Sequence, residues 1–176
     1  MPWASTDRVG EADTRVESVW SQWQTLMVGH EQPRLAKLTD RSDIEQVVTA
    51  SYAKYLPRVD KPPAPLERDY VEAIENEQVW IVGDPVQGLV VLVYQSEAVL
   101  LLENIAVHPS AQGSGLGRRL MEFAESQASA RGHSRLALYT NEVMFENLSL
   151  YEHLGFVEFD RRTEDGHRRI FMEKSL

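Results

Sequence analysis

From Arg34 to the C-terminus the apolar positions recur with two spacings, one typical of strands and one typical of helices. Strands are predicted where apolar residues alternate or run together between turn residues, and helices where they recur every three or four positions. The predicted strands cover 34–38, 78–82, 86–94, 98–107, 136–140, 156–162 and 167–173, and the predicted helices cover 40–55, 66–75, 115–131 and 145–154.

This order of elements predicts an α+β fold of three layers, α/β/α. The central sheet should be mixed and mainly antiparallel, with one parallel pair made by the strand–helix–strand unit at 98–140. Residues 56–65 contain four prolines and are predicted to form a semi-rigid loop. We expect residues 33–176 to form a single domain. Residues 1–32 should be an extension, with Val16, Val19, Trp20, Trp23 and Met27 spaced as one face of a helix.

Composition narrows the function classes. The chain is 43% hydrophobic and 26% charged, which is typical of a globular protein. Its net charge of -9 argues against nucleic-acid binding, and no apolar run is long enough to suggest a membrane partner. The first residues lack the apolar region of a secretory signal, so a cytoplasmic location is expected. With no cysteine and no metal-ligand spacing among its five histidines, no metal site is expected.

The most informative stretch joins the strand at 98–107 to the helix at 115–131. Three glycines stand there at alternate positions, 113, 115 and 117. They let the backbone approach a ligand closely, and the helix start adds unpaired N–H groups and a partial positive charge. Together these features predict an anion site suited to a phosphate or pyrophosphate.

Other interpretations of this glycine turn fit less well. A Walker loop needs Gly-Lys-Ser/Thr at its end, whereas Gly117 is followed by two arginines. A dinucleotide fingerprint needs glycine or alanine where arginine or leucine stands, and it needs the first strand of a parallel sheet. A plain tight turn remains open on spacing alone. A Ser-His-Asp hydrolase is excluded because Gly113-Ser114-Gly115 is too compressed for a nucleophile elbow.

Residues 107–117 read Val-x-Pro-x-x-Gln-x-x-Gly-x-Gly and resemble the acyl-CoA-binding motif of the GNAT-type N-acetyltransferases at every defining position. Residues 147–156, Asn-x-x-x-Tyr-x-x-x-Gly-Phe, resemble that family's later helix-to-strand segment. Residues 52–70 are similar to those of a mostly uncharacterised bacterial branch. With the order of elements from Arg34 to Glu173, the resemblance covers about four-fifths of the chain and implies a GNAT-like fold.

The resemblance implies acetyl-CoA as co-substrate. The pyrophosphate would lie on the glycine turn, the pantetheine arm along the preceding strand, and the third phosphate near Arg118 or its neighbours. The implied cofactor-binding residues are Ile105, Ala106, Val107, Gln112, Gly113, Ser114, Gly115, Leu116, Gly117, Arg118 and Asn147. The family often has asparagine seven positions before Tyr151, where this chain has Met144, so Asn147 and Asn141 are both candidates.

The resemblance also implies two catalytic residues. Tyr151 stands where the family's tyrosine hydroxyl donates to the departing sulfur, and Glu103 stands on a strand where family members carry a base. A phenol with a pKa of about 10 would transfer its proton uphill to a thiolate whose acid has a pKa of about 8.5, so a hydrogen bond is the easier role. A core tyrosine and a solvent-facing glutamate are the structural alternatives.

The acceptor is expected between the first two helices and the proline loop, near Tyr52, Tyr55 and Arg58. The function implied is transfer of an acetyl group to a primary amine of a small molecule, by direct attack in a ternary complex. Two alternatives are acetylation of a protein or peptide and a non-catalytic acyl-CoA-binding module. A homodimer is left open because members of the family often dimerise.

Overall fold

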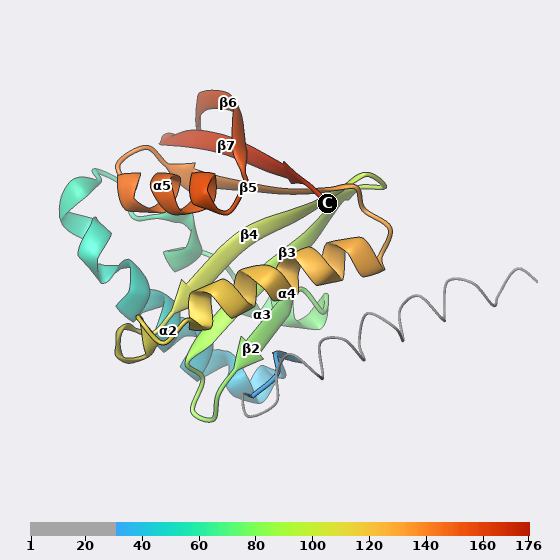
Figure 1. Ribbon diagram of the computed structural model, residues 1–176. Coiled ribbons are helices and arrows are strands. Elements are labelled where there is room, and N and C mark those ends of the chain that lie inside the picture. Colours follow the sequence, from blue (N-terminus) through green and yellow to red (C-terminus); the bar gives the residue numbers. More distant parts are fainter. Residues whose placement is uncertain (1–30) are drawn as a thin grey trace, which may run out of the picture. The chain divides into compact units, whose positions relative to one another are not determined.

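The computed structural model describes residues 31–176, within which Pro33–Leu176 form one compact unit. The helix expected around residues 16–27 lies outside the described residues. Seven strands form one sheet in the order β1-β2-β3-β4-β5-β7-β6 (Figure 1). They are β1 (Arg34–Leu35), β2 (Val79–Val82), β3 (Gly88–Ser96), β4 (Val99–Val107), β5 (Arg135–Asn141), β6 (Val157–Glu164) and β7 (His167–Ser175).

The pairing of the strands is the predicted one. β4 and β5 are parallel, and the other neighbours in the sheet pair antiparallel. The parallel pair is joined through α4 (Leu116–Ala130), as a strand–helix–strand unit requires. β6 and β7 are joined at Asp165-Gly166, where both residues have positive φ angles of 52° and 78°. That backbone suits the tight hairpin which Asp-Gly predicts.

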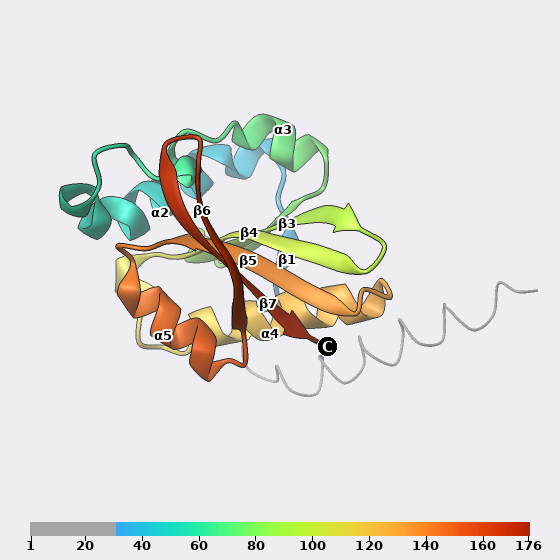
Figure 2. The same ribbon diagram turned by 90° about the horizontal axis from the view of Figure 1, so that it is seen from above.

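Helices cover both faces of the sheet, which completes the α/β/α layering (Figure 2). On one face, α2 (Arg41–Tyr52) and α3 (Tyr70–Glu75) pack their apolar residues against β2, β3 and β4. On the other face lie α4 and α5 (Phe145–His153). The residues of α4 predicted to face inward are all buried: Leu116, Leu120, Phe123, Ala124 and Ala128. The predicted fold class is therefore confirmed.

The largest differences from the predicted element boundaries lie before β2, whereas the later strands differ by one or two residues at their ends. The first strand is only two residues long. The helix expected at 40–55 is α-helical to Tyr52 and continues as a 3-10 helix, Ala53–Arg58, and the proline loop contains a second 3-10 helix, Ala64–Leu66. The helix expected from residue 66 begins at Tyr70, because the Asp69 side chain accepts the Val71 N–H and caps the helix there.

A β-bulge in β4 is the feature that creates space in the sheet. Against β3, Val91 lies opposite Asn104 and Leu92 lies opposite Leu102, which leaves Glu103 as the extra residue. Bulges bend a strand and increase its twist. The pairing of β4 with β5 runs from Val99 to Leu102, yet β4 continues to Val107 and β5 to Asn141. The two parallel strands therefore separate beyond the bulge.

Candidate active site

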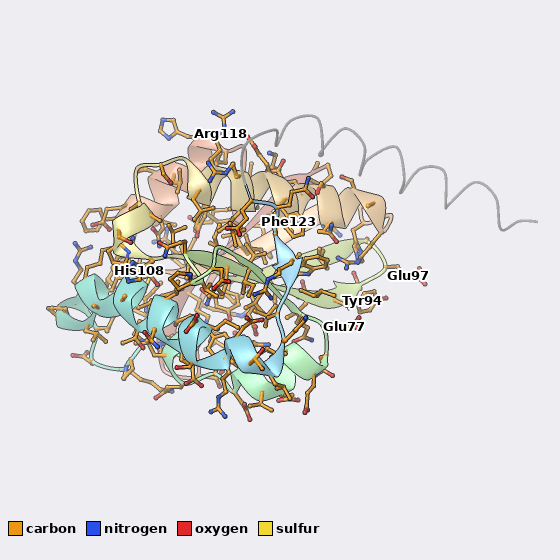
Figure 3. The ribbon with its side chains drawn as sticks, turned by 90° about the horizontal axis from the view of Figure 1, so that it is seen from below. Glu77, Tyr94, Glu97, His108, Arg118 and Phe123 are labelled. Atoms are coloured by element: carbon orange, nitrogen blue, oxygen red, sulfur yellow. The ribbon has the colours of Figure 1, made fainter. Side chains whose placement is uncertain are left out.

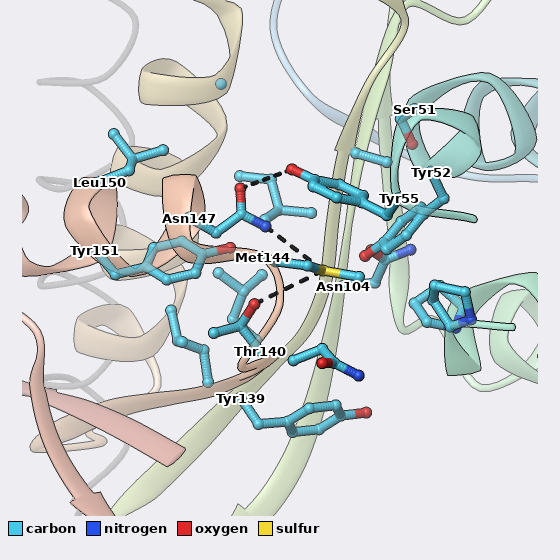
Figure 4. A pocket seen from close by; sticks show the side chains of 18 of the residues that line it. Ser51, Tyr52, Tyr55, Asn104, Tyr139, Thr140, Met144, Asn147, Leu150 and Tyr151 are labelled. Carbon is cyan, nitrogen blue, oxygen red and sulfur yellow. Dashed lines mark hydrogen bonds between the residues drawn. The ribbon is translucent and has the colours of Figure 1, made fainter. Parts of the chain in front are cut away.

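A cavity of about 300 Å³ lies where β4 and β5 separate. Its walls come from both strands, the start of α4, α5, the 3-10 helix at Ala53–Arg58, the proline loop and β7 (Figure 4). Most of the predicted site residues line it: Tyr52, Tyr55, Glu103, Ile105, Ala106, Val107, Gln112, Gly117, Arg118, Asn147 and Tyr151. The fold thus brings together segments that are up to about a hundred residues apart in sequence.

The glycine turn presents bare backbone amides at the start of α4. Gly113 and Gly115 have φ angles of 80° and 82°, a conformation that favours glycine, and Gly115 is the N-terminal cap of α4. Among the described residues, no acceptor binds the amides of residues 113, 114, 115, 117 and 118. Their N–H groups and the helix dipole suit a phosphate group, which agrees with a pyrophosphate site at this turn.

The turn is held open by its own side chains. Ser114 Oγ donates to the carbonyl of Ala111 at 2.7 Å and accepts the Leu116 N–H at 3.4 Å. Gln112 Nε2 donates to the carbonyl of Val107 at 3.1 Å, which ties the turn to the end of β4. Residues 113–116 do not line the cavity wall with side chains, and Leu116 is buried in the core. Their contribution to a ligand is therefore the backbone.

Arg118 stands on the outside of α4, where Figure 3 shows it pointing away from the sheet. Its Nε donates to Glu122 at 2.8 Å, and its side chain is 77% exposed. Because an exposed pair of this kind contributes little to stability, the guanidinium is available to an incoming phosphate. Arg119 donates to the carbonyl of Ser114 at 3.3 Å and so stabilises the glycine turn.

Tyr151 projects from α5 into the cavity, toward Asn147 and Thr140 (Figure 4). Its side chain is buried, and burial raises the pKa of the phenol far above its ordinary value of about 10. Its hydroxyl has no hydrogen-bond partner among the residues described. The group therefore stays protonated at any ordinary pH and has a free O–H to donate within the cavity.

Asn147 lies one helical turn before Tyr151, and its side chain forms a hydrogen bond across the cavity. Its Oδ1 accepts the Tyr55 hydroxyl at 3.1 Å, and its Nδ2 donates to Met144 Sδ at 3.8 Å. Asn141 also lines the cavity, but its Oδ1 accepts the Val143 N–H at 3.1 Å and shapes the turn before α5. Of the two asparagines, Asn147 is therefore the one whose amide faces the centre of the cavity (Figure 4).

Glu103, the bulge residue, lines the cavity and forms an ion pair with Arg68. Both side chains are about four-fifths buried, at 21% exposure for Arg68 and 22% for Glu103. Arg68 also donates through Nη2 to Gln78 at 3.0 Å. No local sequence pattern indicates that Arg68 pairs with Glu103, because the loop before α3 contacts β4 only in the folded protein.

Asn104 is a buried polar residue that sequence reasoning also missed. Its Oδ1 accepts the Tyr52 hydroxyl at 2.9 Å, and its Nδ2 donates to the Tyr70 hydroxyl at 3.1 Å. The Tyr70 hydroxyl in turn donates to the carbonyl of Pro65 at 3.1 Å. Burial raises the pKa of Tyr70 to about 12 and raises that of Tyr52. This network fixes α2, the proline loop and β4 relative to one another.

Arg58 lies outside the cavity lining, unlike the other two expected acceptor residues. It donates to both carboxylate oxygens of Glu146 at 2.8 and 2.9 Å and stacks near the rings of Tyr55 and Phe145. It therefore connects the end of the 3-10 helix to the start of α5 instead of facing an acceptor.

The hairpin of β6 and β7 adds residues that the sequence interpretation did not assign. His167 and Arg169 of β7 line the cavity opposite the proline loop, and Tyr139 of β5 lies beside them. Burial, with the nearby charges of Lys61 and Arg169, lowers the pKa of His167, so its imidazole is neutral at pH 7. By contrast, Arg161 and Arg162 pair with Glu158 and Asp160 on their own hairpin. In the described part of the chain, no cluster of His, Asp and Glu residues could hold a metal ion.

The family relationship agrees with this geometry. Residues 75–158 match the family model described as "Acetyltransferase (GNAT) domain". This part of the chain is therefore similar to the GNAT acetyltransferases over about half of the chain's length.

Relatives and solved structures support the same placement. The chain is 28% identical to the uncharacterized N-acetyltransferase YjgM of Escherichia coli over 145 residues, covering 76% of this chain and 87% of that protein. It is 44% identical to mouse N-alpha-acetyltransferase 80 over 57 residues, or 32% of this chain, and spans only 17% of that relative's length. The fold is similar to that of PaiA N-acetyltransferase from Thermoplasma acidophilum, solved with coenzyme A: the TM-score is 0.69 at 17% identity, over 82% of this chain and 98% of that one.

Within residues 31–176, none of the helices combines the length and the apolar character needed to cross a bilayer.

Proposed function

We propose that this protein transfers the acetyl group of acetyl-CoA to a primary amine of a small molecule, within a ternary complex. The observation that carries the proposal is the set of unpartnered backbone amides at residues 113, 114, 115, 117 and 118. They lie beside the cavity in the gap between β4 and β5. This arrangement supplies a diphosphate site and an adjoining slot. Acetyl-CoA, when bound, supplies the activated thioester.

The backbone of β4 beyond the bulge offers the binding groups for an extended arm. Ile105 and Val107 line the cavity on the side where β5 has separated from β4. The N–H and C=O of Ile105 and the N–H of Val107 can pair with an amide-bearing chain there, as a sheet edge pairs with an added strand, whereas the Val107 carbonyl already accepts from Gln112. Gly117 keeps the entrance clear, because a Cβ there would be in contact with the Val107 side chain at 3.7 Å.

Tyr151 and Glu103 are the proposed proton-handling residues. Tyr151 holds its proton firmly, so its role is to donate a hydrogen bond to a departing thiolate and not to give the proton away. Glu103 faces the same cavity, and its ion pair with Arg68 holds the side chain in place. An ionised carboxylate can accept a proton from an acceptor ammonium, directly or through water.

A small acceptor is favoured over a polypeptide because two cross-connections span the acceptor side of the cavity. Lys61 Nζ of the proline loop donates to the carbonyl of Asp165 on the hairpin tip at 3.0 Å. Tyr55 and Arg58 connect the preceding 3-10 helix to Asn147 and Glu146 of α5. A polypeptide would need an open groove between these elements, whereas a small amine fits within about 300 Å³.

Turnover is tested by incubating the protein with acetyl-CoA and a panel of amines. The release of CoA thiol is followed with a thiol reagent, and the chain contributes no background because it has no cysteine. We expect amine-dependent thiol release and the acetylated amine by mass spectrometry. Binding of acetyl-CoA without turnover of any amine or peptide would indicate a binding module instead, and turnover of peptides alone would indicate a protein acetyltransferase.

A further inference from the structure

We infer that the acceptor amine also carries a carboxylate, and that Arg169 is the residue that binds it. This inference rests on the proposed function and concerns the acceptor end of the same cavity. It starts from the charged side chains that line the cavity, which are Lys54, Arg118, Arg169 and a single acid, Glu103. Glu103 is already paired with Arg68, so the wall of the cavity is net positive.

The cations divide between the two ends of the cavity. Arg118 stands at the glycine turn and serves the phosphates. Arg169 lies at the opposite end, beside Tyr139 and His167. An acceptor that carried only a positive charge would meet a positive surface there, whereas an amine with a carboxylate presents an opposite charge to each side.

The guanidinium of Arg169 is positioned to bind an anion through two of its N–H donors. Its side chain is 12% exposed, and its guanidinium lies 4.4 Å from the centre of the Tyr139 ring, which fixes its plane. Glu164 accepts only from Nη1, at 2.5 Å. Among the described residues no acceptor binds its Nε or Nη2, so two donors remain for a ligand. An arginine positioned in this way recognises a carboxylate through two parallel hydrogen bonds.

Two neighbouring residues support the assignment. Glu164 also lies 3.4 Å from Nη2 of Arg162, whose other partner is Asp160, so Glu164 is not devoted to Arg169 alone. His167 is buried, lines the same wall and has no hydrogen-bond partner within the described part of the chain. Because its residue lines the cavity, the imidazole can pair with a polar group of the acceptor.

The test compares three acceptors that differ in one group: an α-amino acid, its primary amide, and the amine left after decarboxylation. We expect kcat/KM for the amino acid to exceed that for the other two by about tenfold or more, since a charge-assisted hydrogen bond is lost in both. Arg169→Gln should remove this preference by raising KM for the amino acid at least about fivefold more than KM for the decarboxylated amine. Arg169→Lys should restore part of the preference.

The matched control is Arg168→Gln, the neighbouring arginine, whose side chain is 72% exposed and pairs with Glu142. It should leave the preference unchanged. Calorimetric titration with acetyl-CoA is run on every variant and should give the wild-type affinity. Equal kcat/KM for the three acceptors, or an unchanged preference in Arg169→Gln, would overturn this inference and leave the proposed function standing. Normal acetyl-CoA binding with no turnover of any acceptor would overturn both.

Discussion

The hydroxyl of Tyr55 donates a hydrogen bond of 3.1 Å to the side-chain oxygen of Asn147, which lies 92 residues further along the chain. Tyr55 belongs to the 3-10 helix that borders the acceptor side, and Asn147 belongs to α5, which carries Tyr151. This contact crosses the cavity and connects the two walls (Figure 4). It makes the position of α5 dependent on a residue of the acceptor wall.

Removing this hydrogen bond should lower stability in a coupled way. We expect Tyr55→Phe and Asn147→Ala each to reduce the free energy of unfolding. The double-mutant cycle should give a coupling free energy of about 0.5–1.5 kcal/mol, as for a partly buried hydrogen bond. Urea unfolding measures it. Tyr94→Phe is the control, since Tyr94 is 64% exposed, and a coupling near zero for the Tyr55–Asn147 pair would contradict the contact.

Tyr151→Phe should separate catalysis from binding. The phenyl ring fills the same space, so acetyl-CoA affinity should be unchanged, while kcat should fall by about 10²-fold if the hydroxyl stabilises the leaving thiolate. Because burial raises the pKa of Tyr151, the wild-type activity should show no alkaline decline from this group up to pH 10. An unchanged kcat, or an alkaline decline that the Tyr151→Phe variant removes, would contradict the role.

Glu103→Gln should change the pH dependence of kcat/KM. If Glu103 accepts the acceptor's proton, the wild-type profile rises as the carboxylate ionises, and the variant should be slower and lack that rise. Acetyl-CoA binding should be retained, because the glycine turn is untouched. Arg68→Gln is the comparison: it removes the ion-pair partner that positions the carboxylate and should lower kcat/KM while leaving acetyl-CoA binding unchanged. Identical profiles for wild type and Glu103→Gln would rule out the base.

Asp40 provides a pH-dependent contribution to stability at the start of α2. Arg34 binds its two carboxylate oxygens at 2.8 and 2.9 Å, and this contact, with the Lys37 amide, holds the pKa of Asp40 below its usual value. A lowered folded-state pKa stabilises the fold above the unfolded-state pKa of about 3.9, and this stability is lost as pH falls through the folded value.

We therefore expect Asp40→Asn to be less stable than wild type at pH 7, and the difference should shrink as the pH falls below about 4. Thermal unfolding of both proteins between pH 7 and pH 3 measures this. Asp60→Asn, at an exposed loop position, should not differ from wild type across the range. A difference between Asp40→Asn and wild type that persisted at pH 3 would contradict the ion pair as its cause.

The sequence was sufficient for the features that depend on neighbouring residues. The glycine turn could be located because its strand end, its glycines and its helix start lie within about ten residues. The Asp165-Gly166 hairpin could be predicted for the same reason, since its turn type follows from two residues. The single parallel pair could be predicted from one strand–helix–strand unit.

The remaining parts of the site depend on contacts between distant segments. Glu103 could be proposed as a base from its strand, but its partner Arg68 lies 35 residues earlier and follows no local pattern. Arg58 was expected to contact the acceptor because its segment borders the cavity. Its ion pair with Glu146 could not be predicted, because the two residues are distant in sequence. Arg169 and His167 face the cavity because the hairpin bends over the proline loop, which periodicity does not indicate.

The central claim is that the glycine turn binds the diphosphate of acetyl-CoA through its backbone, and calorimetric titration of the protein with acetyl-CoA tests it most directly. Gly117→Leu is the paired variant. Leucine is a better helix former than glycine, so the variant should fold at least as stably, while its side chain extends from the start of α4 beside Val107 and crowds the entrance. The account predicts saturable binding to the wild type and at least tenfold weaker binding to the variant. No binding to the wild type, or equal binding to both proteins, would contradict it.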